Sequence, residues 1–324
     1  MSAGGESEAE SMRFVGIGIE SSYATRKTPD KFYDFVGHSV SLEQELLLHE
    51  SIAHRAPPLG VAGSRRVSGD FEGILDSLNC LRLMYLLLGS CDTTPDEAGS
   101  PTAYKHELTP SNELPSFTLE LNHDYTKSRF LVGCGLNRIE IRANAGELVT
   151  FTAEVTGSNE EVDSASSPST VTVGTPFVFH KAALKKNGTT LALVKTFSLR
   201  IENNIADDVF VLGQQGLAKL IPQALTIEGE LELVFEDESM YNTFLNASDF
   251  ELELELTGGS TGSTVSGFET EKLVITLPKV MLSEGTWQFS RREMVEYTFR
   301  LRGLHDKSSG YAIKATIINT EAEP

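Results

Sequence analysis

The sequence has 324 residues and a formal net charge of -19, from 46 acidic and 27 basic residues. This balance argues against a nucleic-acid-binding surface, because phosphate neutralisation needs clustered Lys and Arg, although a solvated surface also fits it. The length lies near the size at which single cores stop growing, so two domains of roughly 150 residues are expected. Three cysteines without CxxC spacing argue against a disulfide framework or a structural zinc site and favour a reducing cytoplasm.

The first half of the chain is predicted to be one β-rich module. Residues 1–12 are small and acidic, so we expect a mobile segment before the module, which spans residues 13–157. Apolar and polar residues alternate with period two, as in strands with one buried face, and the strands are predicted at 117–121, 139–143 and 149–155. A helix is predicted over 76–88, where it is apolar on more than one face and stops at Gly89.

A linker and a second module are predicted for the rest of the chain. Residues 157–170 carry no large apolar side chain except Val162, so residues 158–174 are expected to be a linker or long loop. The second module then spans 175–324, with strands at 231–235, 252–256 and 273–277. A shorter helix is predicted over 237–246, and the Gly/Ser-rich residues 258–267 are expected to form a hairpin tip.

The two modules repeat one another in sequence. The segment 147–157, ELVTFTAEVTG, matches 293–303, EMVEYTFRLRG, at an offset of 146. Residues 39–43 match 198–202 at an offset of 159, 68–73 match 228–233 at 160 with Gly69 over Gly229, and 117–120 match 250–253 at 133. The four blocks keep their order while the offsets change, as expected if strands are kept and loops vary. Two copies of one β-module, and symmetric self-assembly, are therefore predicted.

No catalytic, cofactor or metal site is predicted. His49 and His54 are five residues apart, so on a helix they would diverge by about 140° and could not share one metal ion. The pair Gly16-Ile-Gly18 has no third glycine in a strand-turn-helix context, which argues against nucleotide binding. The many carboxylates alternate with leucines and form solvated faces, so an enzyme is not favoured.

Two segments resemble the tail tube proteins of long-tailed phages and related viruses. The segment GIGIESSYATRKTPDKF at 16–32 is similar to the opening of that family, and YKHELTPSNELPSFTLE at 104–120 is similar to its most recognisable stretch. Residues 65–72, RRVSGDFE, lie between them as the family pattern expects. The resemblance covers residues 17–157, and the second half only through the internal repeat.

The resemblance implies a mainly β fold with one short helix per module. It implies two tandem β-sandwich or rolled-sheet domains whose strands join those of neighbours into a β-barrel on oligomerisation. Single-module relatives form six-membered rings, so three copies of a two-module chain would make a pseudo-hexameric ring. Stacked rings would form the conduit for the genome, assembled in the host cytoplasm and located in the virion tail. The implied partners are further copies, the tape measure, the tail terminator and tail-tip proteins; DNA would pass without specific binding, and no membrane is involved.

Two sets of residues are predicted to serve assembly. The irregular segment 46–66 contains a Pro-Pro pair and small residues, which is unusual in a compact domain and points to a functional loop. Its candidate residues for contacts between rings are His49, Glu50, Pro57, Pro58, Arg65 and Arg66. The candidate acidic residues lining the tube, which would repel the phosphate backbone, are Glu228, Glu230, Glu232, Glu251, Glu253 and Glu255.

Two alternatives remain open from the sequence. A tail terminator or baseplate hub component could share the module but would form one ring and stop. A β-sandwich binding module, such as a carbohydrate-binding domain, would expose clustered aromatic side chains, against which the single Trp287 and the dispersed tyrosines argue weakly.

Overall fold

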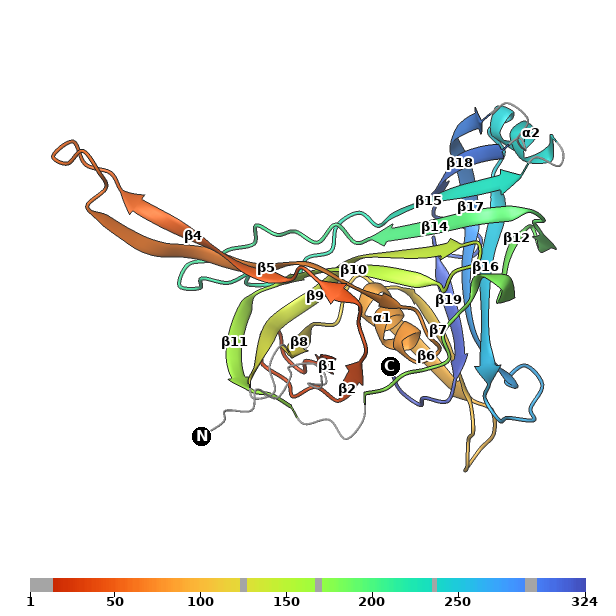
Figure 1. Ribbon diagram of the computed structural model, residues 1–324, viewed down its shortest axis with the longest axis horizontal. Helices are drawn as coiled ribbons and strands as arrows, with labels where there is room; N and C mark the ends of the chain where they lie inside the picture. The colour runs from red at the N-terminus through yellow and green to blue at the C-terminus, as the bar shows by residue number, and fades with distance from the viewer. Residues whose placement is uncertain (1–13, 123–126, 167–170, 235–237, 289–295) are drawn as a thin grey trace, which may run out of the picture.

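The computed structural model describes residues 14–122, 127–166, 171–234, 238–288 and 296–324. These residues form mainly β-strands and two α-helices, arranged as a layered body from which one long hairpin projects (Figure 1). The mainly β fold with one helix per module is confirmed. The mobile segment predicted at residues 1–12 lies outside the described residues, and so does the start of the second predicted helix at Asp237.

The first half of the chain contains eleven of the described strands and one helix. In chain order they are β1 (Val15–Ile19), β2 (Lys31–Tyr33), β3 (Gly37–His38), β4 (Ser41–His49), β5 (Leu59–Ile74), α1 (Asn79–Leu88), β6 (Gly89–Pro95), β7 (Tyr104–Pro110), β8 (Phe117–Asn122), β9 (Lys127–Asn144), β10 (Thr150–Gly157) and β11 (Asn159–Ser164). Helix α1 ends at Gly89, as predicted, because this residue takes φ 86°, a left-handed conformation that glycine adopts without strain.

The second half repeats this order with one hairpin fewer. After a 3₁₀ turn (Phe179–Lys181) come β12 (Ala182–Lys186), β13 (Thr189–Thr190), β14 (Val194–Glu202), β15 (Thr226–Val234), α2 (Ser239–Leu245), β16 (Phe250–Ser260), β17 (Thr270–Gln288), β18 (Glu296–Gly303) and β19 (Lys314–Asn319). Residues between β16 and β17 form the predicted hairpin tip.

The strand pairings repeat in register. In the first half Glu154 of β10 lies opposite Asp70 of β5, and in the second half Arg300 of β18 lies opposite Glu230 of β15. These two pairs are related by the offsets of 146 and 160 found in the sequence. A β-bulge also recurs, at Glu154/Val155 against β9 and at Leu282/Glu284 of β17 against β18. The internal repeat is therefore a repeat of strand pairing and not only of composition.

One continuous sheet joins the two modules. Its order is β4-β5-β10-β9-β14-β15-β18-β17, with every neighbouring pair antiparallel. The junction between the modules is the pair of β9 and β14, where Ile141 lies opposite Leu199. The sheet thus contains two equivalent sets of four strands, one from each half of the chain.

The long strands β9 and β17 also belong to a second layer in each module. The first part of β9 pairs with β8 and β11, and the first part of β17 pairs with β16 and β19. The hairpin of β6 and β7 extends the second of these layers, because β7 pairs with β19. Segments near residue 106 and near the C-terminus are therefore neighbours in one sheet.

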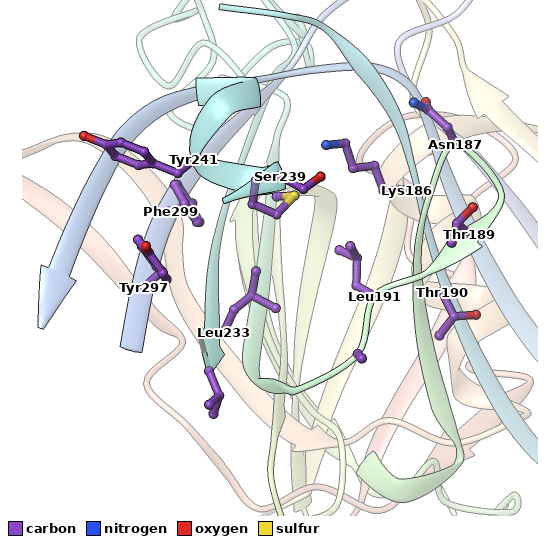
Figure 2. A pocket seen from close by; sticks show the side chains of 13 residues that line it. Lys186, Asn187, Thr189, Thr190, Leu191, Leu233, Ser239, Tyr241, Tyr297 and Phe299 are labelled. Carbon is purple, nitrogen blue, oxygen red and sulfur yellow. The ribbon is translucent and has the colours of Figure 1, made fainter. Parts of the chain in front are cut away.

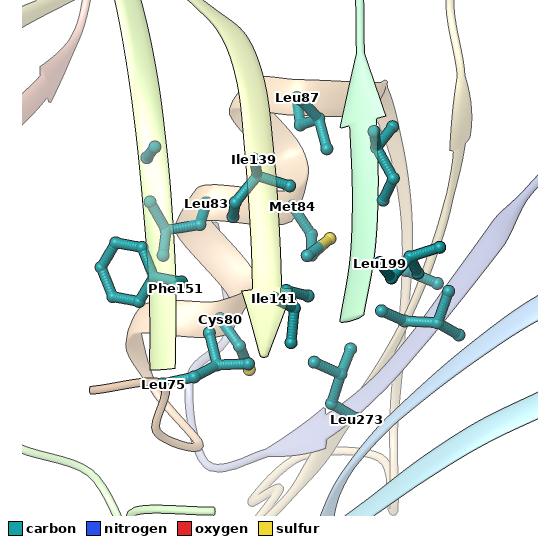
Figure 3. Packing of buried hydrophobic residues seen from close by; sticks show 14 of the residues in the cluster. Leu75, Cys80, Leu83, Met84, Leu87, Ile139, Ile141, Phe151, Leu199 and Leu273 are labelled. Carbon is teal, nitrogen blue, oxygen red and sulfur yellow. The ribbon is translucent and has the colours of Figure 1, made fainter. Parts of the chain in front are cut away.

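Helix α1 fills the space beneath the junction of the modules (Figure 3). Its side chains Cys80, Leu83, Met84 and Leu87 point toward the inner face of β9, β10 and β14. All four are at most 2% exposed, and Leu81, Leu86 and Leu88 on the other faces of the helix are buried as well, which explains why the apolar residues are not confined to one face. The hydrophobic core is consequently shared by both halves of the chain.

Two sequence predictions need correction. The linker predicted from residue 158 is in part a strand, because Asn159–Ser164 forms β11 and pairs with residues 127–132 of β9. The segment 46–66, expected to be irregular, is mostly a β-hairpin in which Leu46–His49 pairs with residues 59–62. Both errors have one cause: these stretches pair through backbone groups, while their side chains lack the alternation of a half-buried strand.

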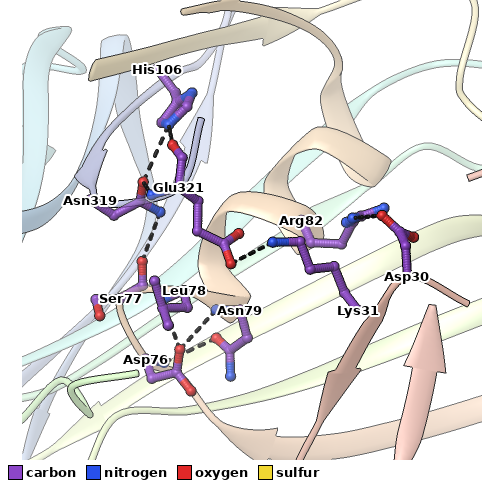
Figure 4. Close-up of polar contacts among 10 residues, drawn as sticks. All are labelled: Asp30, Lys31, Asp76, Ser77, Leu78, Asn79, Arg82, His106, Asn319 and Glu321. Carbon is purple, nitrogen blue, oxygen red and sulfur yellow. Dashed lines mark hydrogen bonds and ion pairs between the residues drawn. The ribbon is translucent and has the colours of Figure 1, made fainter. Parts of the chain in front are cut away.

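A cluster of polar side chains ties the N-terminal strands, α1 and the C-terminal strand together (Figure 4). Lys31 of β2 forms an ion pair with Glu321 at 2.6 Å, and the guanidinium of Arg82, 1% exposed, contacts Asp30 at 2.9 Å. The side chain of Asn319 donates to the carbonyl oxygen of Ser77 at 3.0 Å. Strands that are distant in sequence are thereby joined around the buried end of the helix.

His106 lies at the centre of the contact between β7 and β19. Its Nε2 faces two acceptors, Asn319 Oδ1 at 3.2 Å and the Glu321 carbonyl oxygen at 2.9 Å, so we assign the proton to this nitrogen. Nδ1 then accepts from the Thr93 hydroxyl at 2.8 Å. Burial lowers the pKa of His106 below its ordinary value of 6.5, because the charged imidazolium is disfavoured in this site.

This shift predicts a pH dependence of stability. Below the ordinary pKa of 6.5 the unfolded chain binds a proton that the folded chain does not, so the free energy of unfolding falls as the pH decreases from there toward the folded pKa. We expect a smaller loss of urea midpoint between about pH 7.5 and about pH 5.5 for His106→Gln than for the wild type. His305→Gln, an exposed control, should keep the wild-type dependence. Equal losses in all three proteins would contradict the assignment.

Candidate assembly surfaces

The hairpin of β4 and β5 extends far beyond the body of the molecule as an arm (Figure 1). We define the arm as residues 46–62; its turn is formed by residues 50–58 between the ends of the two strands. The predicted assembly residues His49, Glu50, Pro57 and Pro58 are all exposed at or next to this turn. A two-stranded hairpin alone in water is marginally stable, so a partner that covered the arm would stabilise it.

The exposed side chains of the arm are largely apolar. Leu46, Leu47 and Leu48 are 50–65% exposed, and Leu59 and Val61 on the facing strand are 59% and 54% exposed. Because successive residues of a strand point to opposite faces, this run gives the arm apolar side chains on both faces. Exposed apolar groups gathered in this way mark protein interaction sites.

Arg65 and Arg66 lie at the base of the arm and not at its tip. Arg66 forms ion pairs with Glu43 at 3.0 Å and with Asp207, and the backbone N–H of Arg65 donates to the carbonyl oxygen of Gln215 at 2.9 Å. These contacts anchor the arm to residues 203–225, the segment between β14 and β15. The structure thus separates the six predicted loop residues into two groups, four at the tip and two at the anchor.

The segment 203–225 is the counterpart of the arm in the second module, yet it folds differently. It packs back on the first module, where Leu217 and Leu220 are buried and the Leu217 carbonyl accepts from Tyr23 and Ser158 at 3.0 and 2.9 Å. The arm therefore breaks the symmetry between the two modules. Each chain has one arm and not two in the part that the structure describes.

The eight-stranded sheet has one polar face, opposite the hydrophobic core. On it, carboxylates outnumber basic groups, and several are paired across neighbouring strands, as with Arg138 and Glu154 at 2.8 Å. The acidic members are Glu43, Asp70, Glu72, Glu140, Glu154, Glu202, Glu228, Glu230, Glu232, Glu284 and Glu296, and the basic members are Arg66, Arg138, Arg142, Lys195, Arg200, Arg300 and Arg302. This surface, which we call the polar face, is consequently acidic in sum but carries both charges.

The structure places the first predicted acidic trio on this face. Glu228 and Glu230 of β15 lie opposite Arg302 and Arg300 of β18, and Glu232 contacts Lys195 at 3.2 Å. The arginines come from the second copy of the repeated strand, so the two copies differ in charge at this position.

The second predicted trio is on a different strand. Glu251, Glu253 and Glu255 belong to β16, which pairs with β12 and with the first part of β17. Lys185 contacts Glu253 and Glu255 at 2.7 and 2.6 Å, and these carboxylates raise the pKa of the Lys185 ammonium above its ordinary value. The sequence did not distinguish the two trios, because both have the same alternating pattern.

A surface cavity of about 430 Å³ lies between the β12–β13 hairpin, α2 and β18 (Figure 2). Tyr241, Tyr297 and Phe299 meet beside it, with the Tyr297 and Phe299 rings stacked at 5.7 Å between centroids. Tyrosines that looked dispersed in the sequence are therefore clustered here. However, Tyr297 and Phe299 are at most 4% exposed, so their faces are used in packing and are not a platform for a ligand.

Two absences hold for the described ranges alone. No three His, Cys, Asp or Glu side chains in them are grouped so that they could hold a metal ion. Among the same residues, no helix has the length and apolar character needed to cross a membrane.

Comparison with known families decides the identity of the fold. The family model described as phage tail tube protein matches residues 11–301, a range that includes both modules and the segment between them. The chain belongs to the phage tail tube protein family. No curated protein matches the sequence.

Family membership assigns the tail tube protein a structural role as a component of the virion tail and implies self-assembly into a tube. The match extends the sequence-based resemblance, which was strongest over residues 17–157, to most of the chain. The apolar character of the arm was not predicted. The signal was present as three consecutive leucines, Leu46 to Leu48, followed by a Pro-Pro pair.

Proposed function

We propose that three copies of this tail tube protein form a ring with pseudo-sixfold symmetry and that stacked rings form the conduit for the genome. The observation that carries the proposal is the eight-stranded sheet, in which one four-stranded unit is followed by an equivalent unit through the pair of β9 and β14. Repeating one such head-to-tail step in further copies gives a closed ring or a helical filament. Three chains supply six equivalent units.

The polar face is our candidate for the lining of the channel. Its carboxylates outnumber its basic groups, so the summed field disfavours adhesion of the phosphate backbone, while the arginines reduce the field below that of a purely acidic wall. This role requires further partners. The tape measure protein would occupy the channel before the DNA passes, and the terminator and tail-tip proteins would bind the two ends of the tube. Assembly would take place in the host cytoplasm.

The arm is our candidate for contacts between rings. It projects away from the sheet that would form the ring and exposes apolar side chains on both faces, notably Leu46, Leu47 and Val61. A neighbouring ring stacked on the first would cover these exposed side chains of the arm.

Electron microscopy of the purified protein tests the proposal. We expect filaments with a central stain-filled channel, and a reconstruction should place Glu228 and Glu230 toward that channel. Single rings that do not grow would favour a tail terminator, and protein that stays monomeric at every concentration would contradict a tube role. A channel lined by another surface would refute the assignment of the polar face while leaving the tube intact.

A further inference from the structure

The joint between the modules gives a template for a joint between copies. In β9 and β14, Arg200 lies opposite Glu140, Ile201 opposite Ile139 and Glu202 opposite Arg138. At this joint β9 is paired on its other side with β10, and β14 with β15. Each strand of the joint is thus an inner strand with partners on both sides.

The counterparts of these two strands form the two ends of the sheet. The counterpart of β14 is β4, which pairs with β5, and the counterpart of the second half of β9 is residues 281–288 of β17, which pair with β18. Within the described ranges, neither segment has a partner strand on its other side. An unpaired strand edge is a template for pairing with another chain.

We propose that β4 of one copy pairs antiparallel with β17 of the next copy, with Ser41 opposite Thr286. The register follows from the template, because Ser41 lies 159 positions before Arg200, and Thr286 lies 146 positions after Glu140. The same offsets place Leu42 opposite Gly285 and Glu43 opposite Glu284. The inference rests on the proposed ring and names the strands and the register that close it.

The burial of side chains supports this seam. At the internal joint Ile201 is completely buried, whereas its counterpart Leu42 at the free edge is only partly buried. A strand added beside β4 would cover Leu42. Ser41 and Thr286 are both exposed. Their counterparts at the internal joint, Arg200 and Glu140, lie on the polar face, so this face would continue across the seam.

The seam differs from the internal joint in one charged pair. The template has Glu202 opposite Arg138, but the seam brings Glu43 opposite Glu284, and like charges directly opposite destabilise a strand pair. Each of these carboxylates has an arginine of its own, since Glu43 contacts Arg66 and Glu284 contacts Arg300, both at 3.0 Å. The seam therefore brings two ion pairs side by side, where the joint within the chain has residues of opposite charge facing each other.

Disulfide trapping between two populations of the full chain tests the seam. One population carries Ser41→Cys and the other Thr286→Cys, both in a Cys91→Ser background, because Cys80 and Cys134 are buried. Directly opposite residues have Cα atoms about 4.5–5.5 Å apart, which is within disulfide reach of about 4.4–6.8 Å. On mild oxidation of an equal mixture we expect a covalent dimer in up to about half of the chains, since random mixing joins the two populations in the productive order at roughly one seam in four. Neither population alone should give a dimer.

Two controls make the result decisive. A single chain with Glu140→Cys and Arg200→Cys should close an internal disulfide, which verifies the template. Pairing Ser41→Cys with Glu284→Cys, two residues out of register, should trap at least several-fold less dimer. Filaments without the dimer, or more dimer from the shifted pair, would overturn the seam but not the tube. Absence of both filaments and dimer would overturn the seam together with the proposed function.

Discussion

Removal of the arm is expected to abolish tube formation while leaving the chain folded. The variant replaces residues 46–62 by Asn-Gly, a dipeptide that suits a two-residue hairpin turn. The variant keeps the anchor, because Arg66 retains its ion pairs with Glu43 and Asp207. The new turn joins Glu45 to Gly63, so all the exposed leucines of the arm are removed. The lost residues contribute few contacts to the core, so we expect the free energy of unfolding to change by less than about 1 kcal/mol.

The readout is negative-stain imaging together with thermal unfolding. A deletion of similar kind in the tip between β16 and β17, residues 263–267, serves as the matched control and should still give tubes. Leu46→Ser combined with Leu48→Ser keeps the length of the arm and should shorten the tubes, if apolar contacts are what the arm supplies. Tubes of normal length from the armless variant would contradict the assignment. Isolated rings would support contacts between rings, and complete loss of rings would place the arm within the ring.

The second large effect is expected at the joint of the two modules. Leu199 of β14 is completely buried opposite Ile141, above α1 (Figure 3). Leu199→Ala leaves a cavity beneath the shared sheet and should lower the free energy of unfolding by about 2–5 kcal/mol. Ser198→Ala, one residue away on the polar face, is the control and should change it by less than about 0.5 kcal/mol.

The same variant tests whether the modules unfold together. Trp287, the one tryptophan of the chain, reports on the second module by fluorescence, and the buried thiols of Cys80 and Cys134 report on the first by their reactivity. Because β14 pairs with β9 and β7 pairs with β19, we propose one cooperative unit and expect coincident urea transitions that Leu199→Ala shifts equally. Two separate transitions, or a shift of one probe alone, would show independent domains.

Strand identity and register were largely predictable from the sequence. The period of two in residues such as Ile139 and Ile141 fixes which face of a strand is buried, and a slip of one residue would expose all of them. For this reason the offsets between the repeated segments agree with the pairings of β5 with β10 and of β15 with β18. The end of α1 was predictable too, since Gly89 takes the left-handed conformation that other residues avoid.

Strands that depend on backbone pairing were not predictable. Residues 159–164 carry one large apolar side chain, Val162, which is 61% exposed, so no pattern of burial marks β11 as a strand. It forms because the edge of β9 offers unpaired N–H and C=O groups at that place. The arm is a similar case, because its consecutive leucines show no alternation and its partner strand follows a Pro-Pro turn.

The candidate assembly surfaces, too, were only partly predictable from the sequence. The sequence identified the carboxylates of β15 and β16 as solvated, but it could not place the two trios on different strands or bring Arg300 and Lys195 to the first of them. Likewise it marked 46–66 as unusual without separating the exposed tip from the anchor at Arg66. Pairing between residues far apart in the chain carries no local signal, and it decides which charges meet.

The doubled β pattern could be predicted from the sequence alone, because repeated alternation and repeated glycines encode strands and their registers locally. The tail tube family was indicated by the resemblance of residues 16–32 and 104–120. How the two copies are joined became visible only in the folded chain. The pair of β9 and β14 makes them one sheet, the pair of β7 and β19 links the first half to the last strand, and one arm remains where symmetry would give two. The physical reason is that hydrogen bonds between strand edges depend on where the chain brings two edges together, and side-chain pattern does not record that position.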